Sequence, residues 1–283
     1  DPADGRDVRL PLPEPPDGMT PDRKEVITHV DDGETVELEP GVVMESLVGD
    51  FNTARGLTTG IVTMQPAALL DYHTHPGGES ITVLEGAAEI SVEGRTYRLG
   101  PLDNITIPRW LPHQARNPDS DEVARLHVAL ATSVPEREPV TRTFERRDVP
   151  PDSEGAPGFE RVTRFSNADR QHGVGTGVEF IDYFNAALMP GIEMSGGFAR
   201  FDPRGRLPDH LHDFDESICI IHGEAHCLVE GRQYSLGHCA TAMVPRGRVH
   251  FFINESEDQM EMIWVYAGPM PERIVIAPGF VRE

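Results

Sequence analysis

The chain is short of positive charge and contains no long apolar stretch. Lysine and arginine together number 25 against 47 acidic residues, and the formal net charge is −22. This surplus of negative charge repels nucleic acids and anionic lipid surfaces, so both are excluded as expected partners. No apolar run approaches the roughly 18 residues of a membrane-spanning helix. No signal peptide is recognisable either.

Cysteine is scarce and occurs at Cys219, Cys227 and Cys239. An odd number without Cys-x-x-Cys spacing excludes a disulfide framework and indicates reduced thiols. Cys219 and Cys227 flank one predicted hairpin turn, and buried structural thiols are the favoured interpretation. The reduced thiols and the lack of a signal peptide predict a cytoplasmic protein.

One pattern occurs twice in the chain, with its two copies 137 residues apart. Each copy supplies three histidines and one glutamate, a ligand set typical of a protein-bound divalent metal. The candidate metal ligands are His73, His75, Glu79 and His113 in the first copy and His210, His212, Glu216 and His250 in the second. Two sets in the same register predict a duplicated metal-binding domain.

The spacing of the ligands predicts strands that bend. Residues two apart on a strand share a face and lie about 6.6 Å apart, so His73 and His75 can hold one ion. On a straight strand Glu79 would lie about 20 Å from His73, so the chain must turn between them. Pro76-Gly77-Gly78 is suited to this turn. Asp213-Phe214-Asp215 in the second copy predicts a differently shaped and less open bend.

The fourth ligand of each set is remote in sequence. Only a closed or rolled sheet can bring it close to the other three. His113 and His250 each follow a short apolar segment that ends in Pro-Arg. Hairpin signals at 92–95 and 229–232 lie between the two halves of each copy. Short strands separated by frequent turns predict small all-β barrels with the metal inside.

Both copies resemble the paired motifs of the cupin superfamily, in which a glycine-flanked His-x-His and glutamate precede a proline, a glycine, a histidine and an asparagine. Besides the ligands, the matching residues are Gly86, Gly100, Pro108 and Asn117, and Gly223, Gly237, Pro245, Gly247 and Asn254. The first copy departs from the motif, because Trp110 stands where the second has Gly247. The resemblance implies an all-β bicupin of two tandem double-stranded β-helix (jelly-roll) barrels. Asn117 and Asn254 are expected to stabilise the fold rather than the site.

The repeat predicts how the chain is divided. We expect an N-terminal arm at 1–23, a first cupin domain at 24–135, a linker at 136–159 and a second cupin domain at 160–283. The arm, rich in proline, is expected to be disordered or draped over a neighbour. The linker is rich in proline and charge, and is expected to run over the surface or to carry a strand that pairs with the other barrel.

Three neutral imidazoles and one carboxylate leave two adjacent positions open on a six-coordinate ion. The set favours Fe(II), with Mn(II), Ni(II), Co(II) or Zn(II) as alternatives. Open positions can take a bidentate oxygen ligand, which predicts a small-molecule substrate. Cupins that have lost their metal are the alternative, and they lack one or more of these ligands.

The resemblance extends to quercetinase-like dioxygenases and to oxalate decarboxylases. The first hypothesis is a metal-dependent dioxygenase that acts on a phenolic, enol or diketone compound. The second is a non-redox isomerase, decarboxylase or lyase, and the third a non-catalytic metabolite-binding cupin. No catalytic residue is assigned, and no lid motif carrying an acid is recognisable. A homodimer is expected, with packing of the two barrels of one chain as the alternative.

Overall fold

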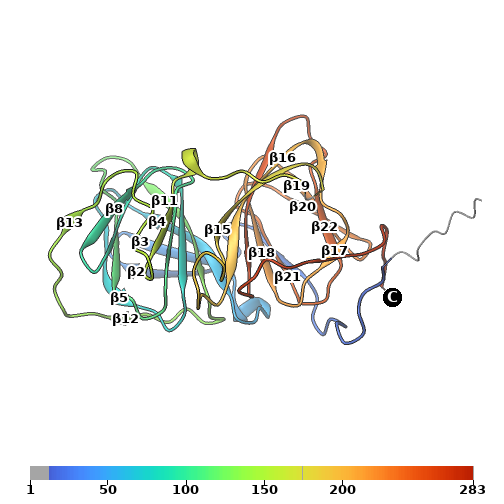
Figure 1. Ribbon diagram of the computed structural model, residues 1–283, viewed down its shortest axis with the longest axis horizontal. Helices are drawn as coiled ribbons and strands as arrows, with labels where there is room; N and C mark the ends of the chain where they lie inside the picture. The colour runs from blue at the N-terminus through green and yellow to red at the C-terminus, as the bar shows by residue number, and fades with distance from the viewer. Residues whose placement is uncertain (1–12, 174, 283) are drawn as a thin grey trace, which may run out of the picture.

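The computed structural model describes residues 13–173 and 175–282, and these form two β-barrels that lie side by side (Figure 1). Apart from the single-turn 3-10 helices η1 (Asp50–Asn52) and η2 (Phe165–Asn167), the elements assigned in these ranges are strands. The all-β prediction is confirmed. No helix in the described ranges is long and apolar enough to cross a membrane.

The first barrel is built from two sheets that face each other. In spatial order, one contains β14 (Arg161–Thr163), β9 (Asn104–Ile107), β6 (Glu79–Glu85), β11 (Ala124–Leu130), β4 (Thr58–Met64), β3 (Val42–Val48) and β2 (Glu34–Glu39). The other contains β12 (Glu138–Pro139), β5 (Leu69–Thr74), β10 (His113–Arg116), β7 (Ala88–Val92), β8 (Arg95–Leu99) and β13 (Arg147–Asp148). Alternate residues such as Ile81, Val83, Leu126 and Val128 fill the space between the sheets.

The second barrel repeats this arrangement. Its main path runs through β1 (Val26–Thr28), β21 (Thr241–Val244), β18 (Glu216–His222), β23 (Met260–Tyr266), β16 (Ser195–Arg206), β22 (His250–Ile253), β17 (His210–Leu211) and β24 (Ile274–Val275). β15 (Thr176–Phe184) pairs with β16, and β19 (Ala225–Val229) pairs with both β20 (Arg232–Leu236) and β22. The long β16 pairs with strands of both faces, so the barrel is one continuous hydrogen-bonded sheet.

The two barrels exchange one strand each. β1 precedes the first barrel in sequence but pairs with β21 of the second, with Val26 opposite Met243. β14 precedes the second barrel but pairs with β9 of the first, with Val162 opposite Ile105. Each of the expected domains, 24–135 and 160–283, therefore contributes one strand to the barrel of the other.

The expected arm and linker both lie against barrels. Residues 1–12 of the arm are outside the described residues, while Pro13 to Arg23 pack on the second barrel, below it in Figure 1. Arg23 forms an ion pair with Asp215 of that barrel. The linker contributes β12, which pairs with β5, and β13, which pairs with β8, so it follows the first barrel.

The contact between the barrels is apolar at its centre. Leu57 and Ala129 of the first barrel join Ile181, Tyr183 and Phe198 of the second in one buried cluster. Hydroxyl groups complete the contact, with Thr59 Oγ1 and Ser217 Oγ 2.7 Å apart and Tyr183 OH donating to Leu102 O. The two barrels of one chain thus form a pseudo-dimer, and the homodimer of chains remains a prediction.

All three cysteines are buried, as their interpretation as structural thiols requires. Cys219 and Cys227 do not face each other, because they belong to different apolar clusters. Cys219 instead lies beside Cys239 at the contact between the barrels. Burial raises the pKa of the Cys227 thiol well above its usual value, which suits an unreactive structural residue.

Candidate metal centres

Strand register brings the first set of predicted ligands to one point. β5 and β10 pair so that His73 lies directly opposite His113. His75 follows β5, and Glu79 begins β6 after the turn at 76–78. All four side chains are buried, and one ligand atom from each lies within 4.8 Å of the others.

The second set has the same construction. His210 of β17 lies opposite His250 of β22, and Glu216 begins β18. The four ligand atoms, including that of His212, again lie within 4.8 Å of one another. All eight residues predicted from the repeat are therefore grouped in space as expected, four to each barrel.

Each of the six histidines is oriented by a backbone carbonyl. In every case Nδ1 lies 2.5–2.9 Å from a main-chain oxygen and donates its hydrogen there. The acceptors are the carbonyls of Asp71, Glu136 and Leu111 in the first barrel and of Pro208, Glu272 and Arg248 in the second. This fixes the tautomer and leaves Nε2 with a free lone pair that points into the barrel.

These lone pairs converge on the carboxylates. Oε2 of Glu79 lies 2.6 Å from Nε2 of His113 and 2.9 Å from Nε2 of His75. Oε2 of Glu216 lies 2.7 Å from Nε2 of His250 and 3.1 Å from Nε2 of His212. A histidine Nε2 lone pair and a carboxylate oxygen are both acceptors, and at these distances they need a cation between them. In addition, Nε2 of His75 and of His212 is buried without a hydrogen bond. The residues present therefore fit a divalent metal ion in each barrel.

The electrostatics favour the ligand form of His73, His210 and both carboxylates. Burial lowers the pKa of His75 and His250, but the charges of Glu79 and Glu216 outweigh it, and the net pKa of these two histidines is raised. Burial and the charge of His113 lower the pKa of His73 to about 3, and burial and His250 lower that of His210 well below its usual value. Burial raises the pKa of Glu79, but the opposing charges of His75 and His113 outweigh it and hold the value well below the usual range. Neutral imidazole and ionised carboxylate are the forms that bind metal.

Two short segments that the 137-residue repeat does not indicate support the sites. Pro135-Glu136-Arg137 spans the expected boundary between the first domain and the linker, where the Glu136 carbonyl orients His75 and Arg137 lines the first metal cavity. Pro271-Glu272-Arg273 does the same in the second barrel, through His212 and the second cavity. We call these segments straps. The repeated Pro-Glu-Arg letters are the signal that could have revealed them.

Backbone geometry explains why the motif has a glycine at the position of Gly247, where the first copy has Trp110. The amide of Trp110 donates to the carbonyl of His75, and the amide of Gly247 donates to the carbonyl of His212. Both residues have left-handed backbone angles, with φ of 63° and 82°. Glycine adopts this conformation freely and tryptophan does not. The Trp110 side chain is half exposed.

The two asparagines lie outside the sites and serve the fold. Asn117 Nδ2 donates to carbonyls that include those of Met64 and Glu122, and Asn254 Nδ2 to those of Phe201 and Asp258. Asn117 and Asn254 directly follow β10 and β22, so each tie joins the end of the strand that begins with the last ligand to other strands of the same barrel. The fold-stabilising role expected for both residues is confirmed.

Each metal set opens into a cavity, and the two cavities differ. The first, about 150 Å³, is almost entirely aliphatic apart from the ligands, Ser46 and the strap residues Glu136 and Arg137. The second, about 290 Å³, contains Glu216 together with Gln171, Asp182 and Arg273. Oδ2 of Asp182 accepts from Gln171 Nε2 at 2.8 Å, while Oδ1 is buried without a partner.

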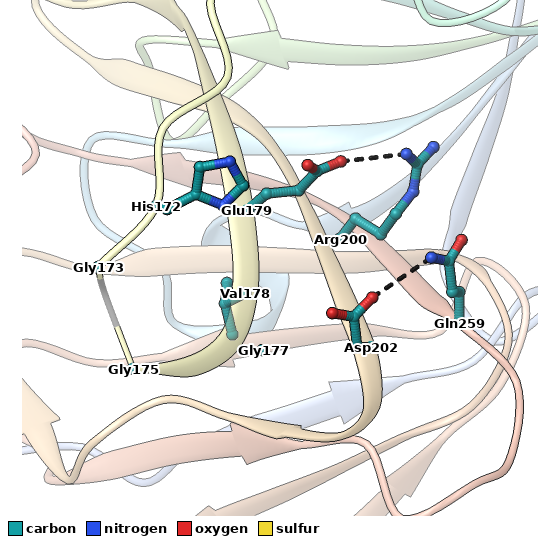
Figure 2. Close-up of a pocket in the computed structure, with 9 residues that line it drawn as sticks. All are labelled: His172, Gly173, Gly175, Gly177, Val178, Glu179, Arg200, Asp202 and Gln259. Atoms are coloured by element: carbon teal, nitrogen blue, oxygen red, sulfur yellow. Dashed lines mark hydrogen bonds and ion pairs between the residues drawn. The ribbon is translucent and has the colours of Figure 1, made fainter.

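A third cavity lies on the outer face of β15 and β16 and is separate from both sets of ligands (Figure 2). Each of its two carboxylates has a hydrogen-bonding partner. Glu179 pairs with Arg200 at 3.1 Å, and Asp202 accepts from Gln259 at 3.3 Å. Both carboxylates of this cavity are therefore engaged, and neither belongs to a set of metal ligands.

The fold and the paired sets of ligands define a two-barrel protein of the cupin class. The chain belongs to the cupin family, because the cupin domain matches residues 60–130 and 197–266, once in each barrel.

Among solved structures, the chain is similar to oxalate decarboxylase from Lactobacillus farciminis in complex with formate. The TM-score is 0.69 and the identity 14%, over 93% of this chain and 91% of that one. Oxalate decarboxylase from Bacillus subtilis at pH 4.6 gives a TM-score of 0.68 and 14% identity, over 90% and 79%. AerE from Microcystis aeruginosa gives 0.62 and 15%, over 85% and 97%. At this identity the likeness shows the bicupin fold alone.

A curated relative, the polyketide synthase CurC of Streptomyces cyaneus, is 32% identical over 77 residues. The match covers 27% of this chain and about half of the relative, 49% of its length.

Proposed function

We propose that the chain is a metal-dependent enzyme that acts on a small oxygenated organic compound, and that its second barrel carries out a non-oxidative proton transfer such as a decarboxylation or an isomerisation. The observation that carries this proposal is the carboxylate of Asp182 in the cavity of the second metal set. Three histidines and one glutamate would hold a divalent ion there, with Fe(II) or Mn(II) suited to the donors.

The bound ion would supply a Lewis acid that polarises a carbonyl or carboxylate oxygen of the substrate. The protein supplies the proton. Oδ2 of Asp182 is held by Gln171, which leaves buried Oδ1 facing no protein donor and able to take or give a proton at a substrate carbon. Aromatic side chains around the cavity exclude water during this transfer. Such a pocket acid is the component that the sequence did not reveal, and the structural likeness to oxalate decarboxylases agrees with it.

A dioxygenase is the second candidate, and it was the leading hypothesis from the sequence. The first barrel favours it, because its cavity is dry and aliphatic and its only other charged side chains are those of the strap. An apolar cavity beside a redox-active ion suits O2, which is itself apolar. In this case the first barrel would perform the oxidation.

The experiment separates the two reactions by their need for O2. Protein reconstituted with Mn(II) under argon is tested for CO2 release from oxalate and for isomerisation of acetylacetone between its keto and enol forms. Protein reconstituted with Fe(II) is tested for O2 consumption with catechol and acetylacetone. Anaerobic turnover that falls at least about 100-fold in Asp182→Asn supports the proposal. Glu179→Gln, on the outer face of the same strand, is the matched control. Turnover that requires O2 and survives Asp182→Asn would select the dioxygenase.

A further inference from the structure

We propose that the second barrel selects a substrate with an aromatic ring and a carboxylate, and that Arg273 receives the carboxylate. This deepens the proposed function by naming a substrate class for the same cavity. The inference stands on two differences between the barrels, one in the charge of the strap and one in the walls of the cavity.

The first difference concerns the arginines of the two straps. Arg137 is already engaged, because its Nη2 donates to the Leu38 carbonyl at 2.9 Å and lies 3.7 Å from Glu39. Both partners come from β2, which pairs with β3 at the edge of the first barrel. The guanidinium of the first barrel is therefore neutralised before any ligand arrives.

Arg273 occupies the same position in the second barrel but lacks such partners. Within residues 13–173 and 175–282, its side chain makes no hydrogen bond or ion pair, although it is partly buried and lines the cavity. Gln171 takes the place of β2. It forms an isolated β-bridge with Phe180 of β15, and its side-chain amide donates a hydrogen bond to Asp182. A partly buried cation without a counter-ion is costly, so an anionic ligand that reaches Arg273 is favoured.

The second difference is in the walls. Strand pairing relates five aliphatic positions of the first cavity to five aromatic positions of the second. Met44, Met64, Ala115, Val128 and Leu130 of the first correspond to Phe180, Phe201, Phe252, Trp264 and Tyr266 of the second. Aromatic walls bind a ring through edge and face contacts that aliphatic walls do not provide.

The two features lie in one cavity with the metal ligand Glu216. Arg273 and the ligand Glu216 line this cavity together with Tyr266. A ring seated against Phe180 and Trp264 would therefore present its carboxylate to Arg273 within reach of the ion. The cavity of the first barrel is half as large and has neither feature.

Trp264 provides a direct reporter of this cavity. The chain has two tryptophans, and Trp110→Phe leaves Trp264 as the only fluorescent indole. In this background, benzoate is titrated against metal-loaded protein and against protein stripped with a chelator. Benzyl alcohol serves as the neutral aromatic probe and hexanoate as the aliphatic acid.

We expect benzoate to quench Trp264 and to bind more tightly than either comparison probe. Arg273→Gln should weaken benzoate about tenfold or more, while Arg273→Lys should restore part of the loss. Arg137→Gln is the matched control and should leave the affinity unchanged. Phe180→Met, which introduces the residue of the first barrel, should weaken benzoate more than hexanoate.

Other results would overturn the inference. Equal binding of benzyl alcohol, or equal effects of Arg273→Gln and Arg137→Gln, would show that Arg273 does not receive the carboxylate. Thermal unfolding of each variant reveals any loss of folding. The effect of Arg273→Gln on benzoate binding is measured with and without metal. If the proposed function fails, metal neither binds nor alters the titration. If only this inference fails, metal still binds and Arg273→Gln has no effect on the affinity for benzoate.

Discussion

Glu25 and Arg232 are 207 residues apart in sequence, and they form a two-point ion pair, Nε to Oε1 at 2.6 Å and Nη2 to Oε2 at 3.0 Å. Tyr234 OH donates to the same carboxylate at 2.7 Å. Glu25 directly precedes β1, so this group fastens the exchanged strand to the second barrel. Glu160, next to β14, is held in the same way by Arg95 and Tyr97 of the first barrel.

We expect Glu25→Gln to lower the free energy of unfolding by about 1–3 kcal/mol, because it leaves the partly buried Arg232 without its counter-charge. Glu160→Gln should have a similar effect through the first barrel. Urea unfolding followed by circular dichroism measures both, with the exposed Glu34→Gln as control. Values within about 0.5 kcal/mol of the control would show that the strands are held by apolar packing alone.

The same ion pair predicts a pH dependence. Burial raises the pKa of Glu25, but hydrogen bonds from Arg232 and Tyr234 outweigh it and the net pKa is lowered from 4.5. A lowered folded pKa gives stability that is present above the unfolded pKa and is lost as the pH falls through the folded value. The stability difference between wild type and Glu25→Gln should therefore be constant above about pH 5 and shrink below about pH 4.5. A difference that grows on acidification would contradict the assignment.

The sequence was sufficient to predict the ligands because their spacing is a direct consequence of strand geometry. His73 and His75 share a face by alternation, and the repeat supplied the remote His113 and His250. The matching Tyr97 and Tyr234 pack in or against the cores of their barrels, and their hydroxyl groups have a further role that the repeat does not indicate. They bind glutamates from exchanged strands, a role that depends on how the two barrels pack.

The straps were missed for a local reason. The constant offset between the copies is lost after the last motif, because the loop that Asn117 closes on Glu122 is one residue longer than the loop that Asn254 closes on Asp258. The equivalent residues Arg137 and Arg273 are thus 136 apart, and a fixed 137-residue comparison does not align them. The cavity walls were also beyond reach, since they require the register of paired strands.

Each metal set should bind its ion independently, because the eight ligands are divided between two barrels with no shared residue. We expect about two divalent ions per chain in the wild type and about one in either His75→Ala or His212→Ala. Elemental analysis after dialysis measures the content, and His226→Ala, a surface residue beside Gln233 and Glu255, is the control. Loss of both ions from one substitution would indicate coupling between the barrels.

The last prediction concerns the left-handed residues that hold His75 and His212. Trp110→Gly should be more stable than Trp110→Ala by about 1 kcal/mol, because both remove the indole and only glycine relieves the φ of 63°. Gly247→Ala should be destabilising by about 1–3 kcal/mol, since an added Cβ would be strained and would meet the Met19 carbonyl oxygen at 2.3 Å. Thermal unfolding of the metal-saturated variants tests both. If Trp110→Ala were as stable as Trp110→Gly, the tryptophan would not be strained, and the first barrel would have no backbone cost for lacking the motif's glycine.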